Sequence, residues 1–429
     1  MKQFLKKIII AILTFEARVV LWKYKPKIIA VTGSVGKTAT KDAIHAVLNQ
    51  SFYIRKSEKS YNSEIGVPLT ILGCTSGWNN PLTWISNILE GLALIFLKNH
   101  YPKLLVLEVG ADRPGDIKKI ARWLTPAVVV VTRFGEVPVH VEFFDSPKQV
   151  IEEKSYLVSA LAPDGLLVLN NDDEKVLGLR KLFGGAVLPY GKEPGSAMLA
   201  SNEQVMYEGS APIGITFKAD YEDTSVPVRL VGVLGGQYTY SALAALSVGV
   251  YLKTNMVRMA QALEHYSGPP GRLTLIDGIK GTYILDDTYN SSPVAMEAAL
   301  QTLREVETAG RKIAVLGDML ELGRYTAAEH KKAGERAAGA SDLLIVVGLR
   351  ARNIVEGALL GGMSEKNIVE FDDAQKAGKY LEGVIGAGDI ILIKGSQSMR
   401  MERTVEEIMA HPEKKNQLLV RQEPEWLKR

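Results

Sequence analysis

The first residues in this chain that could do chemistry form a glycine-rich loop followed by a lysine and a threonine. The apolar residues 28–31 predict a short buried strand, residues 32–36 a loop, and Lys37 the beginning of a helix. Glycines would let the loop backbone approach an anion closely, and the amides at the start of the helix would point toward it. Lys37 would add a positive charge and Thr38 a hydroxyl for Mg²⁺. The stretch therefore predicts a phosphate-binding loop.

This loop follows the shorter form of the phosphate-loop pattern, Thr-Gly-x-x-Gly-Lys-Thr. The general eight-residue pattern has glycine at the position that Val31 occupies here. A glycine-rich turn between a strand and a helix, without a nucleotide, is the alternative interpretation. We expect nucleotide contacts from Gly33, Ser34, Gly36, Lys37 and Thr38.

Three further side chains of suitable chemistry follow along the chain. Residues 104–110 predict a buried strand with Glu108 near its carboxyl end, where open α/β sheets bind their ligands. A buried glutamate is costly unless it is paired or binds a metal ion. His140 follows in a predicted loop, and Lys154 in a predicted helix over 147–161. Taken alone, each of these two has an ordinary interpretation: a loop histidine, and a surface lysine beside two glutamates.

The composition is that of an ordinary globular protein. The chain has 429 residues, of which 46% are hydrophobic and 23% charged, which is enough for two or three domains with substantial cores. The net charge is +3 with both signs interspersed, so a nucleic-acid partner is not indicated. Cys74 is the only cysteine, which excludes an intramolecular disulfide and fits a reducing compartment such as the cytoplasm.

The first 27 residues form a separate apolar segment. Lysines precede an apolar run over 8–13 as in a signal peptide, but no small-residue cleavage site follows, and the run is too short to span a bilayer. We predict an amphipathic helix over 4–22, either packed on the protein body or resting on a membrane surface or a partner. A second apolar segment, 84–97, is similarly short, and the two could pack together.

The remainder divides at the breaker sequence Ser-Gly-Pro-Pro-Gly over 267–271, which neither a helix nor a central strand tolerates. Residues 28–270 predict a central α/β domain with a mostly parallel sheet and a small antiparallel elaboration over about 194–233. Residues 271–411 predict a second parallel sheet with helices on both faces, because strands and helices alternate regularly. We expect the polar, basic tail, 412–429, to be mobile.

Taken as a set, the motifs of residues 28–409 resemble those of the Mur ligases, and most closely of the member that adds D-alanyl-D-alanine. The matching segments are Thr-Gly-Ser-Val-Gly-Lys-Thr at 32–38, Asn-Ser-Glu-Ile-Gly-Val-Pro-Leu-Thr at 62–70, the strand ending in Glu108, Gly271-Arg272, Asp-Asp-Thr-Tyr-Asn-Ser-Ser-Pro at 286–293, Leu-Gly-Asp-Met-Leu-Glu-Leu-Gly at 316–323, and Lys394-Gly395-Ser396.

The resemblance implies a P-loop-type ATPase central domain and a Rossmann-like C-terminal domain. It also implies an ATP-driven amide-forming reaction through an acyl phosphate, with UDP-N-acetylmuramoyl-tripeptide and D-alanyl-D-alanine as substrates in peptidoglycan precursor synthesis. The implied cofactors are ATP, two Mg²⁺ ions and a carbamylated lysine. The family's N-terminal uridine-binding domain is expected to be missing, because only an apolar helix precedes residue 28.

Site roles follow from the resemblance position by position. Lys37 and Arg272 would contact ATP phosphates, and Asp287 and Asn290 the ribose side of the nucleotide. Lys154 would carry the carbamate. The metal ligands would be Thr38, Glu108, His140 and Lys154, and the substrate contacts Asn62, Ser63, Glu64, Lys394 and Ser396.

Two other functions remain open from the sequence. The same ligase machinery could act on a different acid and amine. Alternatively, the chain could be a nucleotide-binding module that catalyses no ligation and docks on a membrane or a partner through residues 4–22 and 84–97. We expect a cytoplasmic protein, and membrane association is the alternative that we keep open.

Overall fold

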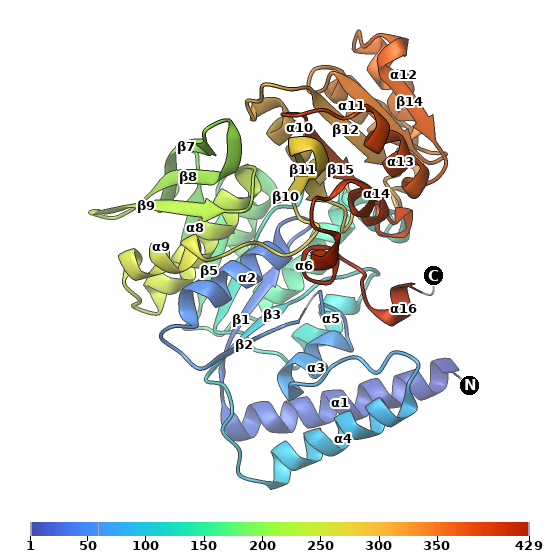
Figure 1. Cartoon of the computed structure of the whole chain (residues 1–429). Helices are drawn as coiled ribbons and strands as arrows, with labels where there is room; N and C mark the ends of the chain where they lie inside the picture. The colour runs from blue at the N-terminus through green and yellow to red at the C-terminus, as the bar shows by residue number, and fades with distance from the viewer. Residues whose placement is uncertain (1, 59, 428–429) are drawn as a thin grey trace.

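Two sheets organise the chain, one in each half of the sequence (Figure 1). The computed structural model describes residues 2–58 and 60–427. The first sheet has nine strands in the order β2-β3-β1-β4-β5-β6-β7-β8-β9, and the second has six in the order β10-β11-β15-β12-β13-β14. The predicted α/β class with two mostly parallel sheets is therefore confirmed.

The central sheet is parallel through β7 and antiparallel beyond it. The antiparallel strands form the predicted elaboration at the sheet edge. The strands are β1 (Lys27–Thr32), β2 (Ile54–Lys56), β3 (Leu104–Glu108), β4 (Val128–Val131), β5 (Leu166–Asn170), β6 (Ala186–Gly191), β7 (Met198–Glu208), β8 (Ala211–Tyr221) and β9 (Thr224–Val231).

Both faces of the parallel part are buried, which explains the continuous apolar runs of β1, β3 and β4. Alternate residues of each strand point to opposite faces, so Ile29 and Val106 belong to one core, and Ala30 and Leu105 to the other. One core is covered by α2 (Lys37–Leu48), α8 (Gly236–Tyr251) and α9 (Met256–Glu264), and the other by α3 (Gly66–Leu72), α5 (Asp116–Ala121), α6 (Pro147–Ser159) and α7 (Glu174–Leu177).

The C-terminal sheet is parallel except for its edge pair, β10 and β11. Helices cover both faces, as in a Rossmann-like fold. The strands are β10 (Thr274–Gly278), β11 (Thr282–Asp287), β12 (Lys312–Gly317), β13 (Leu343–Val347), β14 (Ile368–Phe371) and β15 (Ile390–Lys394). One face packs on α10 (Pro293–Glu305), α11 (Thr326–Ala338) and α12 (Arg352–Leu360), the other on α13 (Ala374–Val384) and α14 (Glu402–Ile408).

The N-terminal apolar segment is helix α1 (Lys2–Tyr24), which packs against α3 and α4 (Pro81–Phe96). Leu13, Ala17 and Val20 are fully buried on its inner side. The two apolar segments therefore pack together, as one of the sequence interpretations anticipated. Of the helices in the described part of the chain, none combines the length and the apolarity that crossing a membrane requires.

From the sequence alone, Gly66 and Pro68 predict turns that end a polar loop beginning at residue 60. That prediction is wrong, because residues 66–72 form the buried helix α3. Pro68 lies in the first turn, where backbone N–H groups have no partner within the helix, so the missing donor costs little. The amide of Val67 donates to the carbonyl of Ser63, which joins the preceding loop to the helix.

The expected mobility of the tail is also wrong. The segment contains α15 (Lys415–Leu418) and α16 (Pro424–Leu427), and Leu419 and Arg421 are buried. The Arg421 guanidinium forms an ion pair of 2.7 Å with Glu402 and donates to the carbonyl of Thr288. A buried arginine requires such partners, so the tail is held on the C-terminal domain.

Candidate active site

The phosphate-binding loop joins β1 to α2 in a conformation that requires its two glycines. Gly33 and Gly36 have φ angles of 142° and 85°, which favour glycine. A Cβ atom on Gly33 would lie 2.0 Å from the hydroxyl of Thr132. Thr132 in turn donates to the carbonyl of Val35 at 2.6 Å, which fixes the loop against the end of β4. The glycines are therefore structural requirements of this turn.

Lys37 folds back over the loop. Its ammonium donates to the carbonyls of Gly33 at 2.9 Å and Ser34 at 3.2 Å, and burial lowers its pKa while the nearby Glu108 carboxylate opposes that effect. Within the described residues, the buried hydroxyl of Ser34 has no hydrogen-bond partner. A donor without a partner at a helix start, beside a lysine, fits the binding of a phosphate.

Thr38 and Glu108 contact each other beside the phosphate-binding loop. The Thr38 hydroxyl donates to one Glu108 carboxylate oxygen at 2.9 Å, and the Asn62 side-chain amide donates to the other at 3.2 Å. The Glu108 amide donates to the hydroxyl of Ser57 at 3.1 Å. A hydroxyl and a buried carboxylate are the oxygen ligands that Mg²⁺ prefers, so Thr38 and Glu108 fit a magnesium ion beside a bound phosphate.

Arg272 reaches the same region from the start of the C-terminal half. Its guanidinium stacks 4.0 Å from the centre of the Tyr289 ring, and its buried Nε has no hydrogen-bond partner within the described part of the chain. Its positive charge contributes to the lowered pKa of Lys37, so the two cations lie within electrostatic reach of each other. Two cations held close together are stabilised when an anion lies between them.

These side chains line one cavity of about 620 Å³ between the two halves of the chain. Both halves contribute, so the cavity exists only when they lie together. From the central half come Ser34, Lys37, Thr38, Asn62, Glu108, Asp112 and His140, and from the C-terminal half Arg272, Tyr289, Asn290, Glu321, Ser396 and Trp426.

His140 connects the two halves inside this cavity. Its Nδ1 lies 2.5 Å from a Glu321 carboxylate oxygen, and its Nε2 lies 3.4 Å from an oxygen of Asp112. The contact with His140 lowers the pKa of Glu321. Both His140 and Glu321 have left-handed backbones, with φ angles of 67° and 62°, a conformation that is uncommon for residues other than glycine. In this arrangement His140 bridges two carboxylates, and it is not paired with Glu108.

Lys154 lies in α6 with 4% of its surface exposed, which overturns the interpretation of it as an ordinary surface lysine. Burial is the main cause that lowers its pKa to about 7, and the positive charge of Lys37 adds to this effect. Lys154 is not among the residues that line the cavity. Among the described residues, no group of three or more His, Cys, Asp and Glu side chains is gathered for a metal ion.

The remaining predicted residues divide between the cavity and its surroundings. Asn290 and Ser396 line the cavity, whereas Lys394 is 1% exposed and is held by Asp287 at 2.6 Å. Lys394 therefore has no free charge for an incoming carboxylate in this conformation. Ser63 and Glu64 lie outside the cavity lining: the Ser63 hydroxyl accepts from the Gly66 amide at the start of α3, and Glu64 pairs with Lys119 at 2.5 Å.

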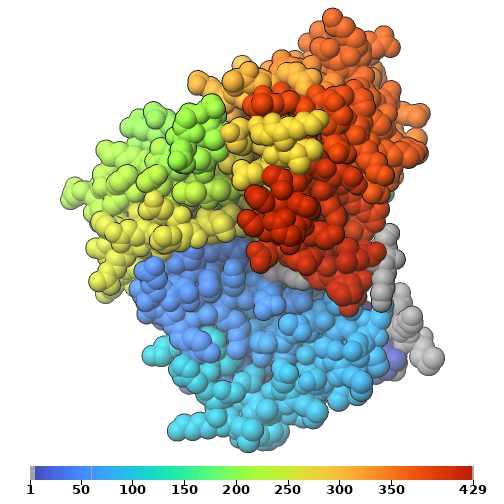
Figure 2. All heavy atoms as spheres, viewed as in Figure 1, coloured from blue at the N-terminus to red at the C-terminus, as the bar shows by residue number. Residues whose placement is uncertain are grey.

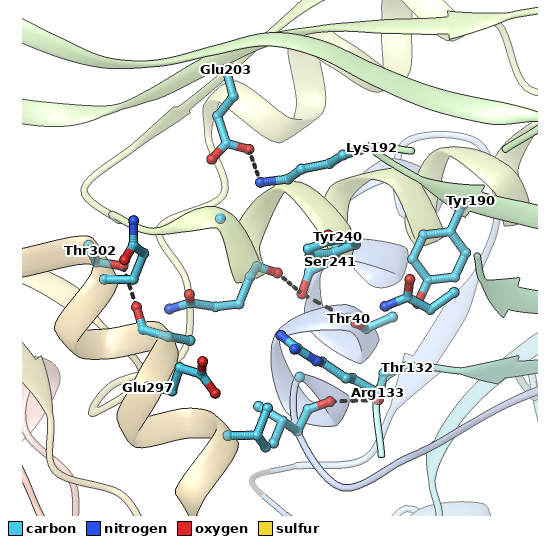
Figure 3. Close-up of a pocket in the computed structure, with 18 of the residues that line it drawn as sticks. Thr40, Thr132, Arg133, Tyr190, Lys192, Glu203, Tyr240, Ser241, Glu297 and Thr302 are labelled. Atoms are coloured by element: carbon cyan, nitrogen blue, oxygen red, sulfur yellow. Dashed lines mark hydrogen bonds and ion pairs between the residues drawn. The ribbon is translucent and has the colours of Figure 1, made fainter. Parts of the chain in front are cut away.

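A second cavity of about 370 Å³ adjoins the other side of the phosphate loop (Figure 3). In Figure 3 the Lys192–Glu203 pair lies at the top, Tyr240 and Ser241 lie in the middle, and Glu297 and Arg133 lie below them. Lys192 and Glu203 form an ion pair of 2.5 Å. Val35 and Gly36 line this cavity, and Gly36 also lines the first, so a ligand on the loop could extend into both.

The sequence analysis did not single out several residues that line the two cavities. Asp112 was detectable in principle, because it follows the carboxyl end of β3, where such sheets bind ligands. Tyr289 lies inside a matching motif but had no assigned role. Trp426 comes from the tail, and Lys192 and Glu203 come from strands or turns without a recognisable pattern.

Comparison with known proteins agrees with this architecture. The Mur ligase middle domain model matches residues 31–249, and the model of the Mur ligase glutamate ligase domain matches 271–397. The UDP-N-acetylmuramoyl-tripeptide–D-alanyl-D-alanine ligases of Bacillus subtilis and Escherichia coli are each 28% identical to this chain. The alignments cover 92% and 88% of this chain, and 79% and 76% of those proteins.

Solved structures give the same result. The MurF ligase of Thermotoga maritima, crystallised with ADP, superposes with a TM-score of 0.77 at 28% identity, covering 93% of this chain and 83% of that one. MurF of Acinetobacter baumannii has a TM-score of 0.76 at 23% identity, covering 93% and 80%, and shares the fold. Because the middle-domain model alone matches more than half of the 429 residues, the chain belongs to the Mur ligase family.

Proposed function

We propose that this chain is an ATP-dependent ligase that joins D-alanyl-D-alanine to the terminal carboxylate of UDP-N-acetylmuramoyl-tripeptide. The observation that carries the proposal is the cavity of about 620 Å³, in which the phosphate loop and Glu108 face Arg272 across the junction of the two halves. The relatives named above, which align over most of the chain, bear this activity in their names.

The reaction has two steps, and both concentrate negative charge. The substrate carboxylate attacks the γ-phosphorus of ATP, which gives an acyl phosphate and ADP. The amine then attacks the acyl carbon, phosphate leaves, and the nitrogen loses a proton as the amide forms. Lys37, Arg272 and the amides at the start of α2 would stabilise the charge on the phosphoryl oxygens.

Thr38 and Glu108 would hold Mg²⁺, which supplies further charge neutralisation when bound. His140 would serve a second ion together with Glu108 and the carbamate of Lys154, which would require His140 to leave at least one of its two carboxylate partners. Lys154 would contribute as a carbamate, because an ammonium cannot coordinate a cation whereas its CO₂ adduct is a carboxylate. Its lowered pKa supports this role, since only the neutral amine reacts with CO₂.

The proposed substrate contacts are Asn62 and Ser396, which line the cavity, with Ser63, Glu64 and Lys394 as positioning residues. Asn290 also lines the cavity and would contact the ribose side of the nucleotide. Asp287 would act through Lys394, which it holds. The cytoplasm supplies ATP and nucleotide-linked precursors, so we place the reaction there, with the exposed sides of α1 and α4 as a contact surface for a membrane or a partner.

The test measures phosphate release by the purified chain with ATP and Mg²⁺, with each substrate alone and with both. Release that requires both the nucleotide tripeptide and D-alanyl-D-alanine, with the expected product mass, supports the proposal. Release that requires another acid and amine would assign the same chemistry to different substrates. Tight ATP binding without turnover on any pair would leave only a nucleotide-binding module. Lys37→Ala serves as the inactive control.

A further inference from the structure

Helix α1 carries an exposed apolar stripe in addition to its buried one. The exposed residues follow a spacing of three, four, three and seven, so they lie along one side of the helix. Single exposed apolar residues are common, but a stripe along a 23-residue helix is not expected on a surface that stays in water. The stripe consists of Leu5, Ile8, Ile12, Phe15 and Trp22.

Helix α4 repeats this arrangement beside α1. The Lys23 ammonium of α1 donates to the carbonyls of Leu94 and Leu97 at 2.9 and 2.7 Å, so the carboxyl ends of the two helices lie together and the helices run in the same direction. The pair forms the outer edge of the molecule (Figure 1), and Figure 2 shows α4 along this edge. The exposed stripe of α4 consists of Leu82, Ile85, Leu89, Leu92 and Phe96.

The charges around the stripes are strongly one-sided. Helix α1 contains five basic residues and one acid, Glu16, which is buried. Helix α4 contains one acid, Glu90, whose carboxylate accepts a hydrogen bond from the Cys74 thiol. The exposed side of α1 therefore combines apolar residues with the positive charges of Lys6, Lys7 and Arg18, whereas the exposed charge of α4 is that of Glu90. Apolar residues beside basic ones are the composition of helices that bind an anionic lipid surface.

A cavity of about 350 Å³ lies where α1 ends, next to its apolar stripe. Arg18 and Lys25 line it together with Trp22 and Trp123. Among the described residues, no carboxylate forms an ion pair with Arg18 or Lys25. Two cations and two tryptophans match a lipid headgroup region, because a phosphate satisfies the cations while the indole rings lie at the boundary between water and hydrocarbon.

We propose that the α1–α4 pair docks on the surface of a bilayer that contains anionic lipid. The apolar stripes would enter the acyl-chain boundary, and Arg18 and Lys25 would contact headgroup phosphates. A bilayer accounts for the apolar stripes and the unpaired cations together, and it suits a helix pair that lies along the outer edge of the protein. The proposal does not depend on the reaction that the cavity catalyses.

The test is flotation of the full chain with vesicles of phosphatidylcholine alone or of phosphatidylcholine mixed with phosphatidylglycerol. We expect binding to the mixed vesicles at low salt, and weaker binding in high salt or without the anionic lipid. Phe15→Glu on α1 and Leu89→Glu on α4 should each reduce the vesicle partition coefficient by about tenfold or more. Arg18→Glu combined with Lys25→Glu should remove the preference for anionic vesicles.

The matched control is Leu360→Glu, because Leu360 in the C-terminal domain is 63% exposed and Leu89 is 60% exposed. This variant should float like the unchanged chain, and circular dichroism with the thermal midpoint establishes that all variants are folded. If the unchanged chain does not float with the vesicles that contain phosphatidylglycerol, the proposal is overturned. The proposal would also be overturned if folded Leu89→Glu floated as much as the unchanged chain. A third contrary result would be that the chain associates with itself in the absence of lipid, that Leu89→Glu abolishes this association, and that the chain binds no vesicles.

Discussion

Replacement of Lys154 tests the site most directly, because the environment of this residue is unusual for a lysine. Burial lowers its pKa to about 7. At pH 7.5 roughly three-quarters of such amines are neutral, compared with about one in a thousand for a lysine of ordinary pKa. Since CO₂ adds only to the neutral amine, burial raises the fraction of Lys154 that can react with CO₂ by several hundredfold, on the order of the ratio of those fractions.

Lys154→Ala should therefore lower the rate of phosphate release by about 100-fold, the loss expected when a metal-site carboxylate is removed, while ATP still binds. Added acetate should restore part of the activity, because it supplies a free carboxylate in the space left by the side chain. With limiting bicarbonate, the activity of the unchanged enzyme should fall as the pH drops below about 7, because Lys154 becomes protonated and cannot form the carbamate.

The control is Lys148→Ala, which removes a lysine from the same helix at a position where the side chain is 85% exposed. It should leave the rate unchanged. Labelled bicarbonate should also give a carbamate resonance in the unchanged chain and none in Lys154→Ala. Full activity of Lys154→Ala, or an active unchanged enzyme with neither the resonance nor a response to bicarbonate, would refute this reasoning.

Five further substitutions probe the fold and the site. Gly33→Ala should abolish ATP binding in calorimetry, because its Cβ would collide with the neighbouring threonine hydroxyl. Glu321→Gln should raise the substrate KM by no more than about fivefold through a looser junction, whereas His140→Ala should lower kcat if the imidazole also serves the metal. Glu16 is buried, and burial raises its pKa to about 7. The free energy of unfolding should therefore fall by up to about 3 kcal/mol as the pH rises from 4.5 to 7, because the buried carboxyl group becomes ionised. Glu16→Gln should remove this pH dependence in denaturant titrations. Arg421→Ala should destabilise the C-terminal half by about 1 to 3 kcal/mol in thermal unfolding, because one oxygen of the buried Glu402 carboxylate loses its partner while Arg400 still pairs with the other.

The sequence predicted those parts of the molecule that depend on local pattern. The phosphate loop, the strand with Glu108 and the parallel sheets follow from short apolar runs and turn residues, and the structure contains all of them. The short strands β2, β6, β10 and β14 were missed. These strands lack the continuous apolar runs of β1, β3 and β4, because polar residues, glycine or proline interrupt them, so only their partners in the sheet define them.

Contacts between distant residues were beyond prediction from the residues alone. Glu152 and Glu153 beside Lys154 suggest a solvated helix surface, yet the Glu153 carboxylate is buried and accepts from the backbone amides of Gly115 and Lys118 at 2.8 and 2.9 Å. These contacts turn that side of α6 inward, and Lys154 is buried with it. Only the packing of α5 on α6, which no local pattern encodes, decides this outcome.

The junction between the two halves of the chain can serve both catalysis and the protection of the acyl phosphate from water. Arg272 and Glu321 reach the phosphate loop only because the C-terminal domain lies against the central one, and the His140–Glu321 contact holds that arrangement. An acyl phosphate hydrolyses if water enters, so a site completed by domain closure forms its full charge-stabilising set only when solvent access is reduced. We therefore expect that opening of the junction removes Arg272 from the phosphate loop and admits water to the site at the same time.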